Sequence, residues 1–341
     1  MDEIKKHILI TGSSGYLGQH LLQSLINKDN NIINDNYIIT AAYGSLSSFD
    51  DNKNNNNNDT ATPMPVPLPC RKVQLDLTSK SSIDSLFNSL EQPVDVLIHL
   101  AAMSSPAQCE KHIEKCNAIN SPMMLLQSLP TTCNVIFLST DQVYNGNPKL
   151  APFDESDVAN ADPVNEYGKS KLQFESMLLE RMNDKLLGNV IILRSSLMLG
   201  GKTPGECRKQ SFLQFVHGRL VNGQSTDYFS DEIRCVVHVQ DVVQVIQYFA
   251  FNFDNNDKGD ISGVYNLGGA DRVSRIDLAL AIAKYLNMDE SLCNSIQRFT
   301  PDFKGGGSVA SPPDISVRME KLKRITGIET IGLNEIVKNS F

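Results

Sequence analysis

The first half of the chain alternates short apolar runs with amphipathic stretches. Residues 16–28 repeat leucine and isoleucine at helical spacing, and residues 82–90 do the same over a shorter length. Between and after them lie five apolar runs of strand length: HILIT (7–11), YIITAA (37–42), KVQLDL (72–77), DVLIHLAA (95–102) and NVIFLST (134–140). Strands that are apolar on both faces and alternate with helices indicate a parallel sheet covered on both sides. The pattern predicts an α/β fold with a doubly wound parallel sheet of the Rossmann type.

The second half is less regular and predicts a smaller, partly interleaved α/β substrate-binding region at the C-terminal side. Its expected elements are strands at 190–199, 235–239 and 263–269, helices at 241–252 and 275–287, a Gly/Pro loop at 304–314 and a final short helix. We expect an NAD(P)-binding Rossmann domain over 1–165. The catalytic helix and substrate-binding region then occupy 166–341, with parts of 190–199 and 235–252 returning to the Rossmann core.

Residues 45–69 interrupt the alternation with a low-complexity stretch rich in Asn and then in Pro. Such a segment buries too little apolar surface to offset the entropy lost on ordering. We expect a disordered insertion between the second and third strands.

Composition narrows the class of protein. With 341 residues, 41% hydrophobic and 21% charged, the chain is typical of a soluble globular protein. A net charge of −8 argues against nucleic-acid binding, and no apolar run approaches the roughly 20 residues of a membrane helix. No signal peptide fits ahead of His7, and seven cysteines without a CxxC pair indicate reduced thiols, no disulfide frame and no metal site. These features predict a cytoplasmic protein.

TGSSGYLG (11–18) lies between the first strand and the first helix. Its three glycines permit a tight turn, close approach of a diphosphate and close helix–strand packing, and the helix N-terminus then faces the phosphates. We therefore expect this turn to bind a dinucleotide through Gly12, Ser14, Gly15, Tyr16, Leu17 and Gly18.

The acidic residue that often binds the adenosine ribose is absent from the end of the second strand, which reads AAYGS (41–45). Without that carboxylate a 2′-phosphate is not repelled, which favours NADP(H), but no arginine replaces it, so NAD(H) stays open. Asp76, at the end of the third strand, has two readings: a contact to adenine or a cap on the following helix.

Ser139, Thr140 and Asp141 end the fifth strand at the carboxyl edge, where open α/β sheets bind ligands. Further along, Tyr167 and Lys171 are four residues apart and share a helical face. A nearby ammonium favours the phenolate, so we expect a lowered pKa that makes Tyr167 a proton donor or acceptor near neutral pH. Lys171 can also bond the nicotinamide ribose.

These motifs, with HLAA (99–102), STDQVY (139–144) and YGKSK (167–171), resemble the extended short-chain dehydrogenase/reductase superfamily. STDQVYNG with PVNEYGKSKLQFE is most similar to the dTDP-4-dehydrorhamnose reductase (RmlD-like) family, which also includes the regulatory β subunit of methionine adenosyltransferase. The resemblance spans nearly the whole chain and is weakest in 28–70 and 200–230.

The resemblance implies site residues. Tyr167 would be the catalytic acid, Lys171 its partner and Thr140 the hydroxyl that holds the reacting carbonyl, with Asp141 as an accessory group. Further implied contacts are Leu77, Ala101 and Ala102 on the cofactor side and Met103, Ser104 and Ser105 lining the substrate pocket.

RCVVHVQD (234–241) resembles the Arg-x-x-x-His-Val-x-Asp segment of the superfamily. By that resemblance Arg234 would meet the diphosphate of a sugar nucleotide; the other reading is a surface arginine in a salt bridge. His238 lies among valines, so we expect a packed core histidine.

Several functions compete. The motifs favour an NAD(P)H-dependent reductase of a keto group, on a 4-keto-6-deoxy sugar nucleotide by resemblance. A dehydratase needs a glutamate where this chain has Gln142, which does not transfer protons near neutrality, whereas an epimerase stays open.

The alternative is a regulatory subunit that binds NADP and docks on methionine adenosyltransferase. The resemblance implies a C-terminal tail for that subunit, and this sequence stops at NEIVKNSF (334–341), which weakens the alternative. A third reading is an NADP(H)-binding scaffold without turnover. The sequence does not name the substrate, and a homodimer is compatible with this architecture.

Overall fold

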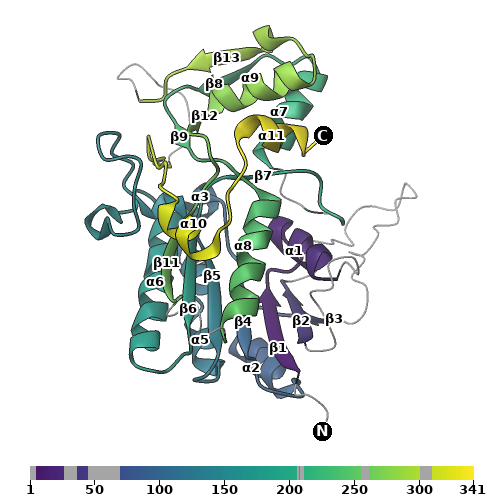
Figure 1. The fold of residues 1–341 in the computed structure, drawn as a ribbon, viewed down its shortest axis with the longest axis vertical. Helices are drawn as coiled ribbons and strands as arrows, with labels where there is room; N and C mark the ends of the chain where they lie inside the picture. The colour runs from purple at the N-terminus through teal and green to yellow at the C-terminus, as the bar shows by residue number, and fades with distance from the viewer. Residues whose placement is uncertain are drawn as a thin grey trace.

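The computed structural model describes residues 5–26, 37–44, 70–205, 207, 211–254, 261–299 and 309–341. The insertion expected over 45–69 lies outside them. A large parallel sheet forms the centre, in the order β11-β6-β5-β4-β1-β2-β3 (Figure 1). Its strands are β1 (Lys6–Thr11), β2 (Tyr37–Tyr43), β3 (Cys70–Gln74), β4 (Val96–His99), β5 (Asn134–Thr140), β6 (Val190–Ser195) and β11 (Gly263–Leu267). The predicted doubly wound α/β fold is confirmed.

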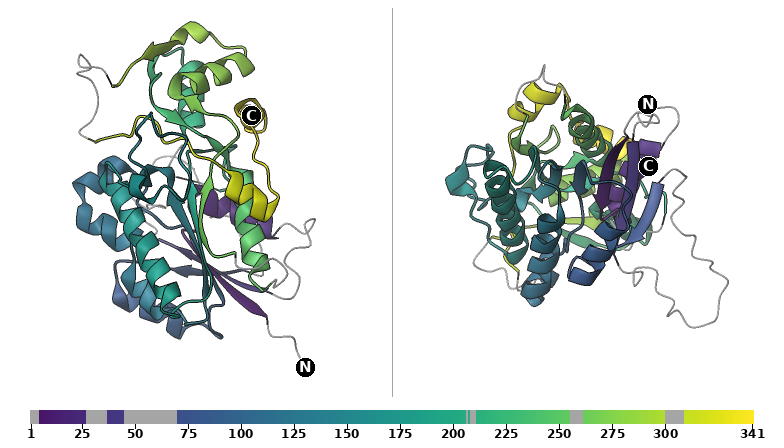
Figure 2. Two further views of the ribbon diagram at one scale, coloured as in Figure 1. Left: turned by 60° about the vertical axis from the view of Figure 1, so that its left-hand side comes forward. Right: turned by 90° about the horizontal axis from the view of Figure 1, so that it is seen from below.

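Helices cover both faces of the sheet, as the view from below in Figure 2 shows. One face carries α1 (Tyr16–Ile26), α8 (Val239–Asn252) and α10 (Glu320–Thr326); the other carries α2 (Lys80–Asn88), α5 (Met123–Ser128) and α6 (Glu166–Asn183). Along β1, Ile8 and Ile10 belong to the first core and Leu9 to the second, and all three are fully buried. Burial on both faces explains why the strands read as unbroken apolar runs.

A smaller lobe lies above the carboxyl edge of the sheet in Figure 1. It contains α7 (Phe212–Val221), α9 (Arg275–Tyr285) and α11 (Leu333–Lys338) around a core of their own. Its short strands pair as β8 (Thr226–Phe229) with β13 (Cys293–Ile296) and β9 (Ile233–Arg234) with β12 (Val273–Ser274). None of the helices in the described ranges is both long and apolar enough to cross a membrane.

Several element boundaries differ from the predictions. The run 190–199 forms two strands, β6 and the short β7 (Met198–Leu199), which pairs with β10 (Val237–His238). The strand predicted at 235–239 is reduced to β10 because α8 begins at Val239. β6 and α8 belong to the Rossmann core, and so does β11, which the pattern did not assign there. The division of the chain at residue 165 stays a prediction.

The helices between β4 and β5 were not predicted. α3 (Pro106–Lys111), α4 (Ile113–Asn120) and α5 have six, eight and six residues. Helices of one to two turns carry too few apolar positions to show a period of 3.6.

Two glycines of the first turn are required by space. Gly12 has φ +71°, and an added Cβ would lie 2.6 Å from the backbone nitrogen of Ala101. A Cβ on Gly18 would lie 2.4 Å from the Gly12 carbonyl oxygen and 2.7 Å from Ser13 Cα. Both obstacles are backbone atoms, so the helix can approach the strand this closely only with glycine at these positions.

We predict that Gly18→Ala lowers the free energy of unfolding by about 1–3 kcal/mol, as overpacking does in a close-packed interior. The matched control is Gly218→Ala in α7, where an added Cβ meets nothing within 4 Å. There alanine should raise stability by up to about 1 kcal/mol through helix propensity. Urea denaturation of both variants measures the difference, and equal effects would contradict the close approach of α1.

Candidate active site

The glycine turn leaves space on its outer side. A Cβ on Gly15 would meet only the Gly12 carbonyl oxygen, at 3.2 Å. The first turn of α1 follows, where helix N–H groups lack intrahelical partners and attract anions. A backbone cradle that is open at Gly15 and closed at Gly12 and Gly18 fits the diphosphate of a dinucleotide. Gly12, Gly15 and Gly18 thus form the predicted turn, and the binding of a dinucleotide by them and by Ser14 stays a prediction.

The side chains of the turn have other partners. Tyr16 donates a hydrogen bond from its hydroxyl to the Gly201 carbonyl at 3.1 Å. Leu17 is 5% exposed and belongs to the core between α1 and the sheet. On the next turn, the Gln19 Oε1 accepts from the Gly205 N–H at 2.8 Å. Tyr16 and Leu17 can therefore contact a cofactor only through their backbone atoms.

Asp76 holds the turn before α2. Its Oδ1 accepts from the Thr78 N–H at 2.9 Å and from the Thr78 hydroxyl at 2.7 Å, and these bonds lower the pKa of the carboxyl. The cap of α2 is Ser79, so the reading of Asp76 as the helix cap is wrong in that form. Leu77 is buried in the second core, and Ala101, beyond β4, donates its N–H to the Thr11 hydroxyl at 3.4 Å.

Thr140, Asp141 and Tyr167 meet at the carboxyl end of β5. Asn165 caps α6 by accepting the Gly168 N–H at 2.9 Å, which places Tyr167 in the first helical turn. The Thr140 hydroxyl lies beside the Tyr167 phenol and lowers the pKa of the phenol. Thr140 in turn donates to Asp141 Oδ1 at 3.2 Å. The strand tip and the helix face thus form the cluster that the sequence predicts.

The protonation of Tyr167 differs from the expectation. Burial raises the pKa of the phenol, the Thr140 hydroxyl lowers it and the charge of Asp141 raises it again. The prediction that a nearby ammonium lowers the Tyr167 pKa is therefore wrong for this structure. A neutral phenol is the form that donates a proton.

Lys171 lies on the same helix with its ammonium against β5. Its Nζ donates to the Leu138 carbonyl at 2.7 Å and lies 4.4 Å from the centre of the Phe137 ring. Burial lowers the pKa of Lys171 to about 7, and the nearby Glu175 carboxylate opposes that shift. His99, on β4, forms a hydrogen bond between its Nδ1 and the Thr11 hydroxyl at 2.7 Å. Burial, and to a smaller extent the charge of Lys171, lowers the pKa of His99 to about 3. His99 is therefore neutral.

Arg234 is buried, so it is not a surface arginine, but it does form a salt bridge, with Glu232 at 4.0 Å. Its guanidinium donates to the carbonyls of Ile233 at 2.7 Å, Pro313 at 3.2 Å and Pro312 at 3.0 Å. Burial lowers the pKa of Arg234 to about 10. Desolvation raises the pKa of Asp141, and Arg234 is the largest influence that opposes it.

Two further arginines gather beside Arg234. Arg275 and Arg298 form ion pairs with the buried Glu232 carboxylate at 3.4 Å and 2.5 Å. Arg275 also lowers the pKa of Asp141. The smaller lobe therefore presents a concentration of positive charge towards the end of β5. No spacing in the sequence predicts this group of arginines, because they come from different elements.

Asn120 fixes the loop after β4. Its Oδ1 accepts from the Met103 N–H at 2.7 Å, and its amide donates to the Met103 carbonyl at 3.2 Å and to the Ser170 hydroxyl at 2.9 Å. The predicted pocket residue Met103 is thereby tied to α6, while Ser104 is exposed. His238 is buried, as expected for a core histidine.

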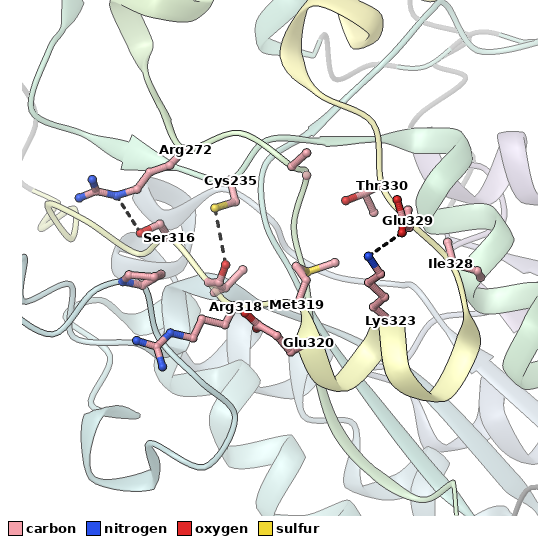
Figure 3. A pocket seen from close by; sticks show the side chains of 14 residues that line it. Cys235, Arg272, Ser316, Arg318, Met319, Glu320, Lys323, Ile328, Glu329 and Thr330 are labelled. Atoms are coloured by element: carbon pink, nitrogen blue, oxygen red, sulfur yellow. Dashed lines mark hydrogen bonds and ion pairs between the residues drawn. The ribbon is translucent and has the colours of Figure 1, made fainter.

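A pocket of about 400 Å³ lies elsewhere, between α10, the segment 316–319 and the turn at 269–272 (Figure 3). Arg272, Arg318 and Lys323 line it with the thiol of Cys235. None of the predicted site residues lines this pocket. In the described part of the chain, no three His, Cys, Asp or Glu side chains are arranged to hold a metal ion.

The comparison with protein families gives one match over most of the chain: the RmlD substrate binding domain, at residues 6–338. The chain is 24% identical over 276 residues to the dTDP-4-dehydrorhamnose reductase of Aggregatibacter actinomycetemcomitans, covering 78% of this chain and 86% of that protein. It is 27% identical over 201 residues to subunit beta of bovine methionine adenosyltransferase 2, covering 58% and 56%. In five of the curated relatives, the region that aligns with this chain makes up 56% to 65% of the relative's own length.

Solved structures share the fold. The dTDP-4-dehydrorhamnose reductase of Bacillus anthracis, solved in complex with NADP, superposes with a TM-score of 0.71 at 20% identity, covering 98% of both chains. The UDP-glucose 4-epimerase of Thermotoga maritima, solved with UDP-glucose, gives 0.72 at 18% identity and the same coverage. At these identities the likeness establishes the fold alone.

The buried lysine makes stability depend on pH. The Lys171 pKa is about 7 in the folded chain, and an exposed lysine titrates near pH 10.4. Between these values the unfolded chain binds a proton that the folded chain does not, so stability rises with pH by up to about 1.4 kcal/mol per unit. We predict that this rise disappears in Lys171→Met.

The measurement is urea denaturation at a series of pH values, with Lys169→Met as control. Lys169 is on the same helix and exposed, and its pair with Glu166 raises its pKa, so it stays charged through the window. Parallel stability curves for the wild type and Lys171→Met would show that the lysine is not desolvated.

Proposed function

The chain belongs to the RmlD substrate-binding-domain family, and on that premise we propose that it is an NAD(P)H-dependent reductase of a keto group on a sugar nucleotide. The observation that carries the proposal is the cluster that Thr140 and Asp141 at the end of β5 form with Tyr167, on the helix that also carries Lys171. The dTDP-4-dehydrorhamnose reductases among the relatives suggest a 4-keto-6-deoxy sugar nucleotide as the substrate.

The proposed cofactor is NADP(H), with NAD(H) open. The glycine cradle and the first turn of α1 would hold its diphosphate, and Lys171 its nicotinamide ribose. When bound, the cofactor supplies the hydride that reduces the carbonyl carbon. Relatives of the same fold have been solved with either nucleotide.

The residues of the chain supply the rest of the reaction. The neutral Tyr167 phenol donates its proton to the carbonyl oxygen as the alcohol forms. The Thr140 hydroxyl, which lies beside the phenol, holds that oxygen in reach. Arg234, Arg275 and Arg298 give the smaller lobe the positive charge that a nucleoside diphosphate needs.

The second candidate is the regulatory subunit of methionine adenosyltransferase. The 27% identity to the bovine β subunit favours it, and so does a fold that binds the cofactor without requiring turnover. Stoichiometric pull-down of a methionine adenosyltransferase catalytic subunit, with no ketone reduction detected, would support this candidate over the reductase.

We predict that Tyr167→Phe leaves NADPH affinity within about twofold and lowers turnover about 10²–10⁴-fold, the usual contribution of a general acid. Tyr285→Phe, a surface tyrosine 44% exposed, is the control and should keep wild-type turnover. Binding is followed by NADPH fluorescence and turnover by the loss of absorbance with a 4-keto sugar nucleotide. Undiminished turnover of Tyr167→Phe would exclude the proposed role.

We also predict tighter binding of NADPH than of NADH, because neither Tyr43, which ends β2, nor Gly44 after it has a carboxylate to repel the 2′-phosphate. Fluorescence titration with both nucleotides measures the ratio. Tighter binding of NADH would refute the predicted cofactor preference and would leave the proposed role of Tyr167 unchanged.

A further inference from the structure

A buried ion pair lies on α6 one turn beyond Lys171. Glu175 is 2% exposed, and Arg194 of β6 is 5% exposed. Arg194 Nε lies 3.2 Å and 3.1 Å from the two carboxylate oxygens, and its Nη2 donates to Oε2 at 2.7 Å. The Ser139 hydroxyl donates a further bond to Oε1. Both carboxylate oxygens therefore have partners.

The network continues away from the site. Arg194 Nη1 donates to the Tyr144 hydroxyl at 3.0 Å, which donates to Asn266 Oδ1 at 2.8 Å. Both Tyr144 and Asn266 are fully buried. The chain of bonds thus joins α6 to β5, β6 and β11 inside the molecule.

The position of this network relative to the cluster is specific. Ser139 immediately precedes Thr140, and Glu175 follows Lys171 by four residues, so the carboxylate ties the two elements that carry the cluster. A buried ion pair is costly to desolvate, and apolar residues of similar size often stabilise a fold as well. Stability alone therefore gives little reason for charge at this point.

We propose that Glu175, held by Arg194 and Ser139, is a positioning residue that sets α6 against the tip of β5 and places a fixed negative charge one helical turn from Lys171. The consequence for turnover rests on the proposed function; the consequence for Lys171 does not.

The groups that act on the Lys171 charge come from several elements. They are Glu175 on α6, Cys109 on α3, Cys116 on α4 and His99 on β4. Burial raises the pKa of the Cys109 thiol and lowers that of His99, which leaves both neutral. In the described part of the chain, Glu175 is the largest influence that favours the ammonium.

The test is the titration of Lys171 by NMR, with lysine labelled at Cε and the resonance assigned from Lys171→Met. The variants are Glu175→Gln, Arg194→Gln and the double change Glu175→Gln with Arg194→Met. Glu175→Gln removes the negative charge, so the Lys171 pKa should fall. Arg194→Gln leaves that charge without its partner, so the pKa should rise. The double variant restores neutrality and should titrate below the wild type.

Opposite shifts in two variants that break the same ion pair support the proposal, since a purely structural contact would not give them. The exposed Lys169 is the internal control and should titrate unchanged. Should Arg194→Gln not fold, the fall in Glu175→Gln and in the double variant carries the test. A Lys171 titration that stays at the wild-type value in the folded variants would overturn the proposal.

The same variants separate this inference from the proposed function. The titration needs neither substrate nor turnover, so an inactive wild-type protein would refute the reductase and leave the Lys171 shifts readable. In an active protein, the alkaline limb of the turnover profile should move to lower pH in Glu175→Gln, in step with the NMR value.

Discussion

Seven parallel strands end at the same edge of the central sheet, and this constraint brings together residues far apart in the chain. The glycine turn follows β1, Met103 follows β4, and Thr140 ends β5. The N-terminus of α6 then presents Tyr167 to the same edge, because Asn165 ends the preceding loop as a helix cap. The smaller lobe adds its arginines from above. Each group is local in sequence to its own strand, and only the parallel arrangement makes them one site.

Burial decides the charge state of that site. Desolvation raises the pKa of Tyr167 and lowers that of Lys171, so the phenol stays neutral and the amine holds its proton only weakly near pH 7. If Lys171 were protonated in only part of the molecules, only that part would be ready for each turnover. The Glu175–Arg194 pair supplies a fixed negative charge one turn away, and breaking such a pair on one side costs about 3–5 kcal/mol. Position and electrostatics are thus linked through one carboxylate.

The sequence predicts the sheet, the glycine turn and the Tyr167–Thr140 cluster because each depends on a local pattern: an apolar run, a spacing of glycines, a helical repeat. It does not predict the split of 190–199, since the apolar run continues through the bend between β6 and β7. The direction of the Tyr167 pKa shift was missed because burial is a tertiary property. Lys171 and Glu175 do stand at helical spacing. The partner of Glu175, however, is Arg194 on β6, and no pattern in the sequence indicates that β6 lies beside α6.

A crystal structure with NADP bound tests the central claim, that one coenzyme meets the helix and the strand tip together. The account predicts that the ribose next to the nicotinamide accepts a hydrogen bond from Lys171 Nζ and that the Tyr167 hydroxyl lies beside the nicotinamide ring. It also predicts the diphosphate at Gly15. A nicotinamide placed away from the end of β5, with the diphosphate outside the glycine turn, would contradict it.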